Sequence, residues 1–382
     1  MLPTADTKAV DEGLKYINND ACYPTIVSLG QIISYLKSGE LDLDKTAIFM
    51  SQTGGGCRAS NYVSLLRKAL RDLDMEQIPV VSVALSTGLE HNPGFKITPG
   101  LAKRLLMGII YGDVLMKVLY ATRPYEKEPG SANALAEKYS QIADANIAKG
   151  SLSGFRKNIK EMVHAFDTLP LQEDLVKPKV GVVGEILVKY HPNANNDIVG
   201  VIKAEGGEAV VLELVDFFLY GMHSKAYNFR HLSGSFGQME LNKLYISVIE
   251  WLRGSARKAL KNSNRFKPPA FIYETAAKAE EILSEGNQCG EGWLLTGEMA
   301  ELIDNGVENI VCLQPFACLP NHVVGKGMLK AMRKRNPLAN IAAIDYDPGA
   351  SNVNQLNRIK LMMAAAHKNL REKQQKEEKT GA

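Results

Sequence analysis

Three cysteines in turn-like segments are the residues of this chain best suited to chemistry. They are Cys22 in segment 18–24 (NNDACYP), Cys57 in segment 52–58 (QTGGGCR) and Cys318 in segment 314–320 (QPFACLP). Each segment is rich in Gly, Pro or Asn, and an amphipathic helical pattern follows each one. A thiolate at a helix start faces unpaired amides and the positive end of the helix dipole, so we expect lowered thiol pKa values. Three such thiolates suit an iron–sulfur cluster with one iron left open for substrate.

A run of three glycines precedes the second cysteine. Gly54, Gly55 and Gly56 have no side chains, so their backbone amides can approach the sulfides of a cluster, and we predict that they bind this cofactor. The run also invites a phosphate-loop interpretation, but the Lys that such a loop requires does not follow it. We therefore expect any ATP used by this system to bind another protein.

The candidate catalytic residue is His322. It follows Cys318 by four positions, so it would lie near a cluster held there and could serve as an acid or base. The remaining cysteines are weaker candidates. Cys312 lies within an apolar strand pattern, which is typical of a packed cysteine. Cys289 lies in a loop that opens a helix, where a cysteine is less often a ligand than a structural residue. For all of these cysteines, the alternative is a structural role as small buried side chains.

The composition is that of an ordinary globular protein. The chain has 382 residues with 45% hydrophobic and 23% charged residues, and its net charge is +3 without a basic tract before the C-terminus. We therefore expect no nucleic-acid partner. No run of 18 apolar residues and no signal-peptide pattern is found, so we expect no membrane segment. Five cysteines without a secretion signal are typical of the reducing cytosol, which predicts a cytoplasmic protein.

Short β-branched runs alternate with longer helical stretches, which predicts an α/β fold with parallel sheets flanked by helices. The predicted strands are 46–50, 78–85, 179–185, 208–214, 309–313 and 340–345. A polar stretch at 172–174 predicts a domain junction, and the expected units are an N-terminal domain over 1–172, a C-terminal domain over 173–367 and a charged tail over 368–382. Parallel sheets bind ligands beyond the carboxyl ends of their strands, where Cys57 and Cys318 both fall.

The helical patterns give three further expectations. A long apolar helix is predicted over 97–121, with a break near Gly112, and the middle of the chain, 217–269, is expected to be mostly helical. A single helix is predicted over 323–335. The charge-dense end of the chain, from residue 368, is expected to be a frayed helix or a tail.

Several segments resemble a known family. They are NNDACYPTIVSLGQ, SQTGGGCRASNY, VGVVGEILVKYHPNANND, GEGWLLTGEM, QPFACLPNHVVGKGM and IDYDPGASNVNQLNRIKLM. These segments are similar to the C-terminal region of large acyl-CoA dehydratase activase-related proteins, a region that itself resembles the 2-hydroxyacyl-CoA dehydratase subunits. The resemblance covers about residues 13–363, and the ATPase portion of those proteins has no counterpart here, so the chain resembles a separately encoded dehydratase-like unit.

The resemblance implies two Rossmann-like or flavodoxin-like domains with a [4Fe–4S] cluster between them. Cys22, Cys57 and Cys318 match the family order of two N-terminal ligands and one C-terminal ligand. The implied activity is that of a lyase: an ATP-dependent activase delivers one low-potential electron, which serves the reductive radical dehydration of a 2-hydroxyacyl-CoA. The implied partners are the activase, an acyl-CoA substrate and a second dehydratase-like subunit.

Two alternatives stay open at this point. The same family includes ATP-dependent reductases of small molecules that carry a double-cubane [8Fe–9S] cluster, and the pattern of three cysteines does not separate the two cluster types. The second alternative is a non-catalytic subunit that binds the activase, with buried cysteines that hold no metal. The substrate and the fourth iron ligand are not specified by these patterns.

Overall fold

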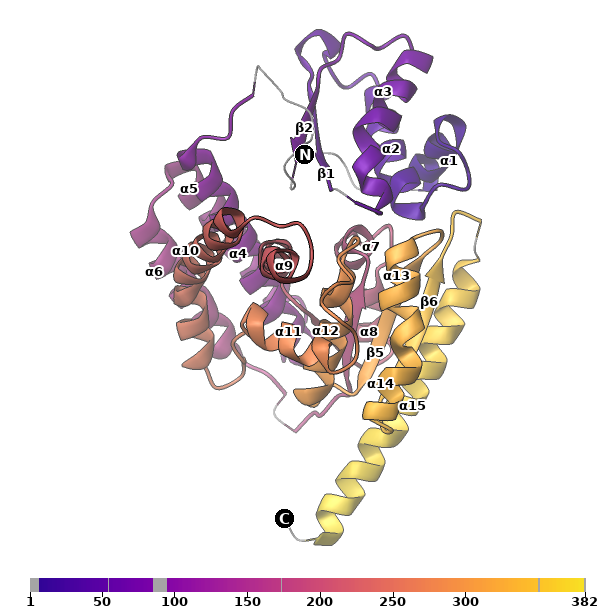
Figure 1. Cartoon of the computed structure of the whole chain (residues 1–382). Coiled ribbons are helices and arrows are strands. Elements are labelled where there is room, and N and C mark those ends of the chain that lie inside the picture. Colours follow the sequence, from indigo (N-terminus) through magenta and orange to yellow (C-terminus); the bar gives the residue numbers. More distant parts are fainter. Residues whose placement is uncertain (1–6, 54, 85–94, 173, 350, 381–382) are drawn as a thin grey trace.

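The computed structural model describes residues 7–53, 55–84, 95–172, 174–349 and 351–380. Within these residues the chain has an α/β fold with two parallel sheets, which confirms the predicted fold class (Figure 1). The first sheet pairs β1 (Ile48–Gln52) with β2 (Val80–Ala84). The second sheet has the strands β3 (Lys179–Gly184), β4 (Glu208–Val211), β5 (Asn309–Pro315) and β6 (Asn340–Tyr346).

The larger sheet has the strand order β4-β3-β5-β6, and each neighbouring pair is parallel. Because successive side chains of a strand point to opposite faces, β5 contributes to two cores. Leu313 shares one core with α8 (Ile198–Ala204) and α15 (Asn352–Thr380), and Cys312 shares the other with α12 (Gly292–Asp304). Helices thus cover both faces, and the carboxyl ends of the strands meet at one edge.

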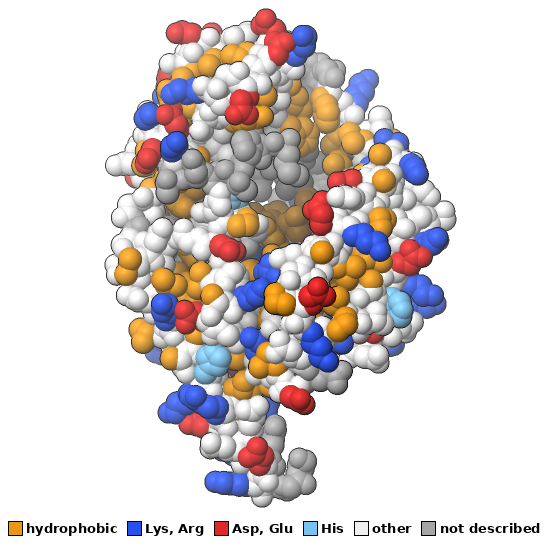
Figure 2. Space-filling model, turned by 180° about the vertical axis from the view of Figure 1, so that it is seen from behind, with side chains coloured by type: hydrophobic (Ala, Val, Ile, Leu, Met, Phe, Trp, Pro, Cys, Tyr) orange, Lys and Arg blue, Asp and Glu red, His pale blue; other side chains and the backbone are white. Residues whose placement is uncertain are grey.

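The small sheet belongs to an N-terminal unit with its own apolar core. Its helices are α1 (Thr7–Tyr16), α2 (Tyr23–Leu36) and α3 (Tyr62–Asp72). Helices α1 and α2 cross closely because Gly30 has no side chain: a Cβ placed there would lie 1.9 Å from the carbonyl oxygen of Ala9. Seen from behind, the molecule is hollowed where this unit meets the remainder, and hydrophobic side chains are visible in the hollow (Figure 2).

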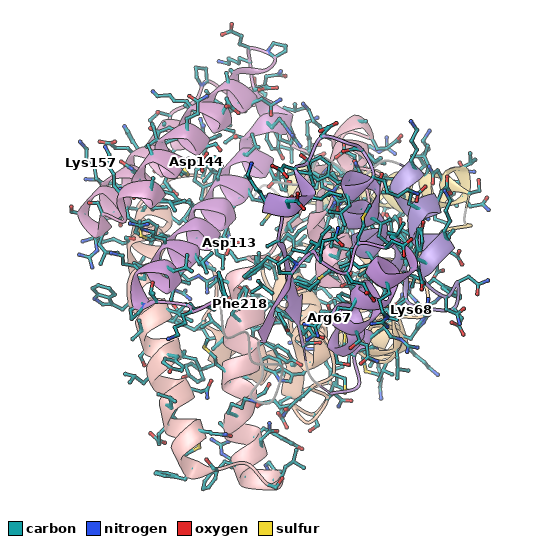
Figure 3. The ribbon with its side chains drawn as sticks, turned by 90° about the horizontal axis from the view of Figure 1, so that it is seen from above. Arg67, Lys68, Asp113, Asp144, Lys157 and Phe218 are labelled. Atoms are coloured by element: carbon teal, nitrogen blue, oxygen red, sulfur yellow. The ribbon has the colours of Figure 1, made fainter. Side chains whose placement is uncertain are left out.

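A helical region lies beside the larger sheet (Figure 1). Its helices are α4 (Pro99–Thr122), α5 (Ser131–Lys149), α6 (Leu152–Asp167), α9 (Val215–His231), α10 (Phe236–Lys261) and α11 (Ile272–Glu280). Figure 3 shows Asp113 of α4 near Phe218 of α9. The Asp113 carboxylate accepts hydrogen bonds from the backbone N–H groups of Leu214 (2.8 Å) and Val215 (3.0 Å), so it caps the start of α9.

Two expectations about helix breaks were wrong. The predicted break near Gly112 is absent, because α4 is continuous from Pro99 to Thr122 and a lone glycine weakens a helix without interrupting it. The single helix predicted over 323–335 is instead divided into α13 (Leu319–Val324), a 3₁₀ turn and α14 (Leu329–Arg335). The division falls at Gly325, where a Cβ would lie 2.7 Å from the carbonyl oxygen of Asn321.

Helix α4 is also the one helix among the described residues that is long and apolar enough to span a membrane, counted as Pro99–Tyr125 with a mean hydropathy of 1.5. Its apolar residues Met107, Ile110 and Val114 are buried against α5, α6 and α10 in a shared core. The same length and composition are found in the core helices of soluble proteins.

The C-terminal helix α15 extends well beyond the sheet that it covers. Its residues Ile359, Met362 and Ala366 are buried in the core of the larger sheet. The charged segment predicted to fray continues as helix to Thr380, and Figure 1 shows this end projecting away from the body of the molecule.

Candidate metal centre

Each of the three predicted metal ligands immediately precedes a helix. Cys22 is the N-cap residue of α2, and Cys318 is the N-cap residue of α13. Cys57 is the N-cap residue of a 3₁₀ turn, Arg58–Asn61, that leads into α3. All three have extended backbone conformations, so each thiol lies where a loop turns into the first helical turn.

The three side chains line one cavity of ≈ 320 Å³. The cavity lies between the N-terminal unit and the carboxyl ends of the larger sheet, and the backbone connects these two parts directly. The N–H of Tyr23 donates to the carbonyl oxygen of Phe316 (3.0 Å). The N–H of Phe316 in turn donates to the carbonyl oxygen of Tyr346, at the end of β6 (2.7 Å). The structure therefore brings together cysteines from both ends of the chain.

The glycine segment before Cys57 also reaches this cavity. Gly55 and Gly56 line it, whereas Gly54 lies outside the described residues. Gly55 has a φ of +76°, a conformation that other residues rarely adopt, and a Cβ on Gly56 would lie 3.1 Å from the Sγ atom of Cys289. The segment therefore needs glycine, because Cys289 approaches it closely.

A strained residue precedes the third cysteine. Ala317 has a φ of +55°, in the left-handed region that is unfavourable for a residue with a Cβ. Such a conformation costs on the order of 1–3 kcal/mol and is concentrated at functional sites, where the surrounding structure fixes it. Ala317 itself lines the cavity, directly before Cys318.

The expected lowering of the thiol pKa values was wrong. Burial raises the pKa of Cys57 to about 11, and it raises the pKa values of Cys22 and Cys318 as well. The carboxylate of Glu291 adds to the effect at Cys57 and Cys318. Loss of water around the sulfur outweighs the favourable helix ends, so these thiols ionise readily only when a cation binds them.

Two of the sulfur atoms already have polar neighbours. The Cys22 Sγ lies 2.9 Å from the Thr25 hydroxyl oxygen, and the Asn321 side-chain amide donates to Cys318 Sγ over 3.5 Å. Hydrogen bonds of this kind favour a ligating thiolate and adjust the potential of a bound metal group.

Two buried glutamates, Glu185 and Glu291, complete the lining, and the sequence patterns did not single them out. Glu185 follows β3 and accepts from the N–H of Val188 (2.9 Å), while Glu291 accepts from the N–H of Ile186 (3.0 Å). Burial and the nearby Glu291 raise the pKa of Glu185 to about 8, and burial also raises that of Glu291. At neutral pH this carboxyl pair therefore holds a proton.

Unpaired polar atoms are concentrated around the cavity. Of the seven buried side-chain atoms without a hydrogen-bond partner among the described residues, five belong to residues in or beside these loops. They are Thr53 Oγ1, Tyr220 Oη, Gln288 Nε2, Gln314 Oε1 and Asn321 Oδ1. Buried polar groups are nearly always paired, but none of these five residues lines the cavity itself, so their unpaired atoms do not identify a ligand there.

The donor set around the cavity consists of three thiols, the ligand type that iron–sulfur clusters take. In the described part of the chain, no three His, Cys, Asp or Glu side chains are grouped closely enough to hold one metal ion. In a cubane each thiolate binds a different iron, so the cluster itself separates its ligands. Three thiols around one cavity match this requirement and leave one iron of a four-iron cubane without a cysteine.

The other candidates lie outside this lining. His322 is exposed on α13, and it is not among the residues that line the cavity. Cys312 is fully buried in the sheet core, as expected for a packed thiol. Cys289 is exposed, but its sulfur borders the Gly56 loop, which its sequence context alone did not predict.

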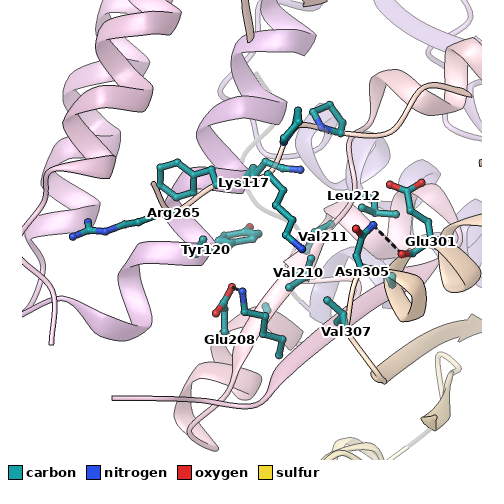
Figure 4. Close-up of a pocket in the computed structure, with 18 residues that line it drawn as sticks. Lys117, Tyr120, Glu208, Val210, Val211, Leu212, Arg265, Glu301, Asn305 and Val307 are labelled. Atoms are coloured by element: carbon teal, nitrogen blue, oxygen red, sulfur yellow. Dashed lines mark hydrogen bonds and ion pairs between the residues drawn. The ribbon is translucent and has the colours of Figure 1, made fainter. Parts of the chain in front are cut away.

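A second cavity, of ≈ 170 Å³, lies along the edge strand β4 (Figure 4). Two of its three lysines form ion pairs, Lys117 with Glu213 (2.7 Å) and Lys179 with Glu208 (3.4 Å). None of the described residues that line it is a Cys or a His. It is therefore a less suitable metal site than the cysteine cavity.

No protein-family model matches this chain, and no curated protein matches it.

Proposed function

We propose that this protein binds a [4Fe–4S] cluster through Cys22, Cys57 and Cys318 and acts as a component of the 2-hydroxyacyl-CoA dehydratase type. The observation that carries the proposal is the convergence of three helix-capping cysteines, far apart in the sequence, on one cavity.

We assign the following roles in binding and catalysis to the protein's own residues. The three thiolates hold the cluster, and Thr25 and Asn321 lie beside two of the sulfur atoms. When bound, such a cluster supplies low-potential one-electron chemistry. A lyase of this type must also protonate a departing hydroxyl group, and Glu185 is suited to that task because it is protonated at neutral pH and lines the cavity. Its Oε2 atom accepts a hydrogen bond from the Val188 N–H (2.9 Å), which holds the carboxyl group in place.

The wider assignment is part of the same proposal. We propose a cytoplasmic protein with two Rossmann-like or flavodoxin-like domains, divided near residue 172, with an ATP-dependent activase as its electron donor and an acyl-CoA as its substrate. The family resemblance of the cysteine-bearing segments supports this assignment. The parallel sheets, with the cysteine loops at the carboxyl ends of β1 and β5, are consistent with it.

The test is iron and acid-labile sulfide per chain, with an absorption spectrum, on protein purified without oxygen. We expect about four of each. Cys22→Ala, Cys57→Ala and Cys318→Ala should each lose most of the iron, whereas Cys312→Ala, the matched control in β5, should keep it. About eight irons would favour the double-cubane reductase. Metal-free protein after anaerobic reconstitution, or full iron in Cys318→Ala, would refute the cluster assignment.

A further inference from the structure

Helix α10 carries a row of exposed apolar side chains that no other described part of the chain covers. Leu241, Leu244, Val248 and Trp251 are 46%, 58%, 50% and 59% exposed, and Ser255 and Lys258 continue the same row. The spacing alternates between three and four residues, so the row follows the seven-residue period of a coiled-coil seam. It is about 26 Å long at 1.5 Å per residue.

The opposite side of α10 is already used by the fold. Ile246 and Ile249 are buried in a core shared with α9 and α11, and Leu252 and Ala256 are buried against α4, α5 and α6. The exposed row is therefore additional to the apolar surface that the fold itself requires. A contiguous exposed apolar stripe on a helix marks a place where another helix binds.

The row ends in a groove of ≈ 580 Å³ between α6 and α10. Its lining includes Arg156, Lys160 and Lys258, and among the described residues no carboxylate forms an ion pair with any of the three. The Arg156 guanidinium lies over the Trp251 ring, 4.8 Å from its centre. The groove's one carboxylate, Asp167, accepts from the N–H groups of residues 264 and 265 and keeps its negative charge, so three cations face a single anion. This end of the seam therefore attracts negative charge.

Gly254 lies in the lining of this groove and indicates close approach of another chain. It is in the interior of a 26-residue helix, where glycine is less favourable than alanine. A Cβ placed on Gly254 would meet nothing within 4 Å, so the packing of this chain does not require a glycine there. A helix that lies against the α10 backbone would require it, because small residues let two helices approach closely.

We propose that the α10 seam and its groove bind one amphipathic helix of a partner protein, apolar along the seam and acidic where it meets Arg156, Lys160 and Lys258. A second copy of this chain is a poorer occupant. Parallel pairing of two α10 helices would set these cations against one another. Antiparallel pairing would set them against Glu240, which already pairs with Lys243 (2.7 Å). The proposal is independent of the cluster and of the dehydratase assignment.

The probe is a synthetic coiled-coil peptide of about three heptads, with Leu at the seam positions and Glu at the flanking ones. The matched peptide has Lys in place of Glu. Trp251 reports binding, because the only other tryptophan, Trp293, is fully buried. We expect a saturable blue shift of the Trp251 emission with the Glu peptide, weakened by salt, and none with the Lys peptide.

Two pairs of variants test the positive charge of the groove and the glycine of α10 separately. Lys258→Glu should weaken binding of the Glu peptide about tenfold or more. Lys261→Glu should leave it unchanged, because Lys261 is exposed on the same helix but does not line the groove. Gly254→Leu should block binding, whereas Gly221→Leu on α9, where a Cβ is equally free of neighbours, should not. Circular dichroism and thermal melting confirm that each variant is folded.

Three results would overturn the proposal. These are equal binding of the Glu and Lys peptides, unchanged binding by Lys258→Glu, and self-association in sedimentation experiments that Gly254→Leu abolishes. The last would assign the seam to a second copy.

Discussion

Glu185 and Glu291 lie on the same cavity as the three cysteines, and each carboxylate accepts a hydrogen bond from the backbone that follows β3. The pair thus caps the short helix that follows β3, α7 (Ile186–Tyr190), and places two acidic groups next to thiols that are themselves difficult to ionise. Glu291 raises the pKa values of Cys57 and Cys318, and Glu185 raises those of Cys22 and Cys318.

The first prediction concerns the reactivity of the thiols in metal-free protein. At the alkaline pH where they ionise, both carboxyls are charged and oppose thiolate formation. Glu291→Gln should therefore shift the alkylation profile of Cys57 to lower pH, by up to about one unit. Glu185→Gln should shift that of Cys22 instead. Iodoacetamide labelling followed by peptide mass spectrometry measures each site separately, and identical profiles in both variants would contradict the arrangement.

The second prediction concerns the pH dependence of stability through Asp113. Burial, with the nearby Glu213, raises the pKa of Asp113 to about 7. A carboxyl whose pKa is higher in the folded state stabilises that state fully below its unfolded pKa, near 3.9, and this contribution is lost as the pH rises to about 7. The wild-type free energy of unfolding should therefore fall over this range by a few kcal/mol more than that of Asp113→Asn. Urea unfolding at a series of pH values measures the difference, and parallel curves would rule it out.

The third prediction uses two helical glycines with different surroundings. Gly30→Ala must displace backbone at the crossing of α1 and α2, so we expect a loss of about 1–3 kcal/mol of stability or more. Gly112→Ala in α4 meets nothing within 4 Å and should stabilise the protein by about 1 kcal/mol. Chemical denaturation compares them, and a neutral Gly30→Ala variant would show that the crossing is looser than described.

The fourth prediction concerns the buried cation of the helical region. Arg253 is only 2% exposed and pairs with Asp216 (2.7 Å) and Glu250 (3.3 Å). Arg253→Met leaves these carboxylates without their cation and should cost about 3–5 kcal/mol. The exposed pair of Arg358 with Asp345 (3.0 Å) provides the control, and Arg358→Met should cost less than about 1 kcal/mol. Equal losses in thermal melts would contradict the distinction.

Strands β3 and β5 could be predicted from the sequence because they are buried on both faces. Segments such as 179–185 and 309–313 are nearly continuous apolar runs, and the structure has β3 and β5 there, each within about two residues of the predicted end. Breaks between helices were harder to predict from the sequence. The sequence does not distinguish Gly112 from Gly325. Only Gly325 lies so close to a carbonyl oxygen that a Cβ would not fit, and that contact depends on tertiary packing.

The cysteines of the candidate site could also be singled out from the sequence, because the turn, the cysteine and the helix are adjacent in sequence. Glu185 and Glu291 could not be assigned to the site from the sequence, since each is near Cys22, Cys57 and Cys318 only in three dimensions. The thiol pKa values were predicted in the wrong direction for the same reason: the helix start is a local feature, whereas desolvation depends on everything packed around the sulfur.

The distribution of the three cysteines along the chain also sets an order of events during synthesis. Cys22 and Cys57 are translated well before Cys318. At about 5–20 residues per second, the third thiol follows the first by some tens of seconds. During that interval the nascent N-terminal unit has two thiols and no third partner. Insertion of the proposed cluster must therefore wait for synthesis of Cys318, and oxidation of the two earlier thiols would compete with it.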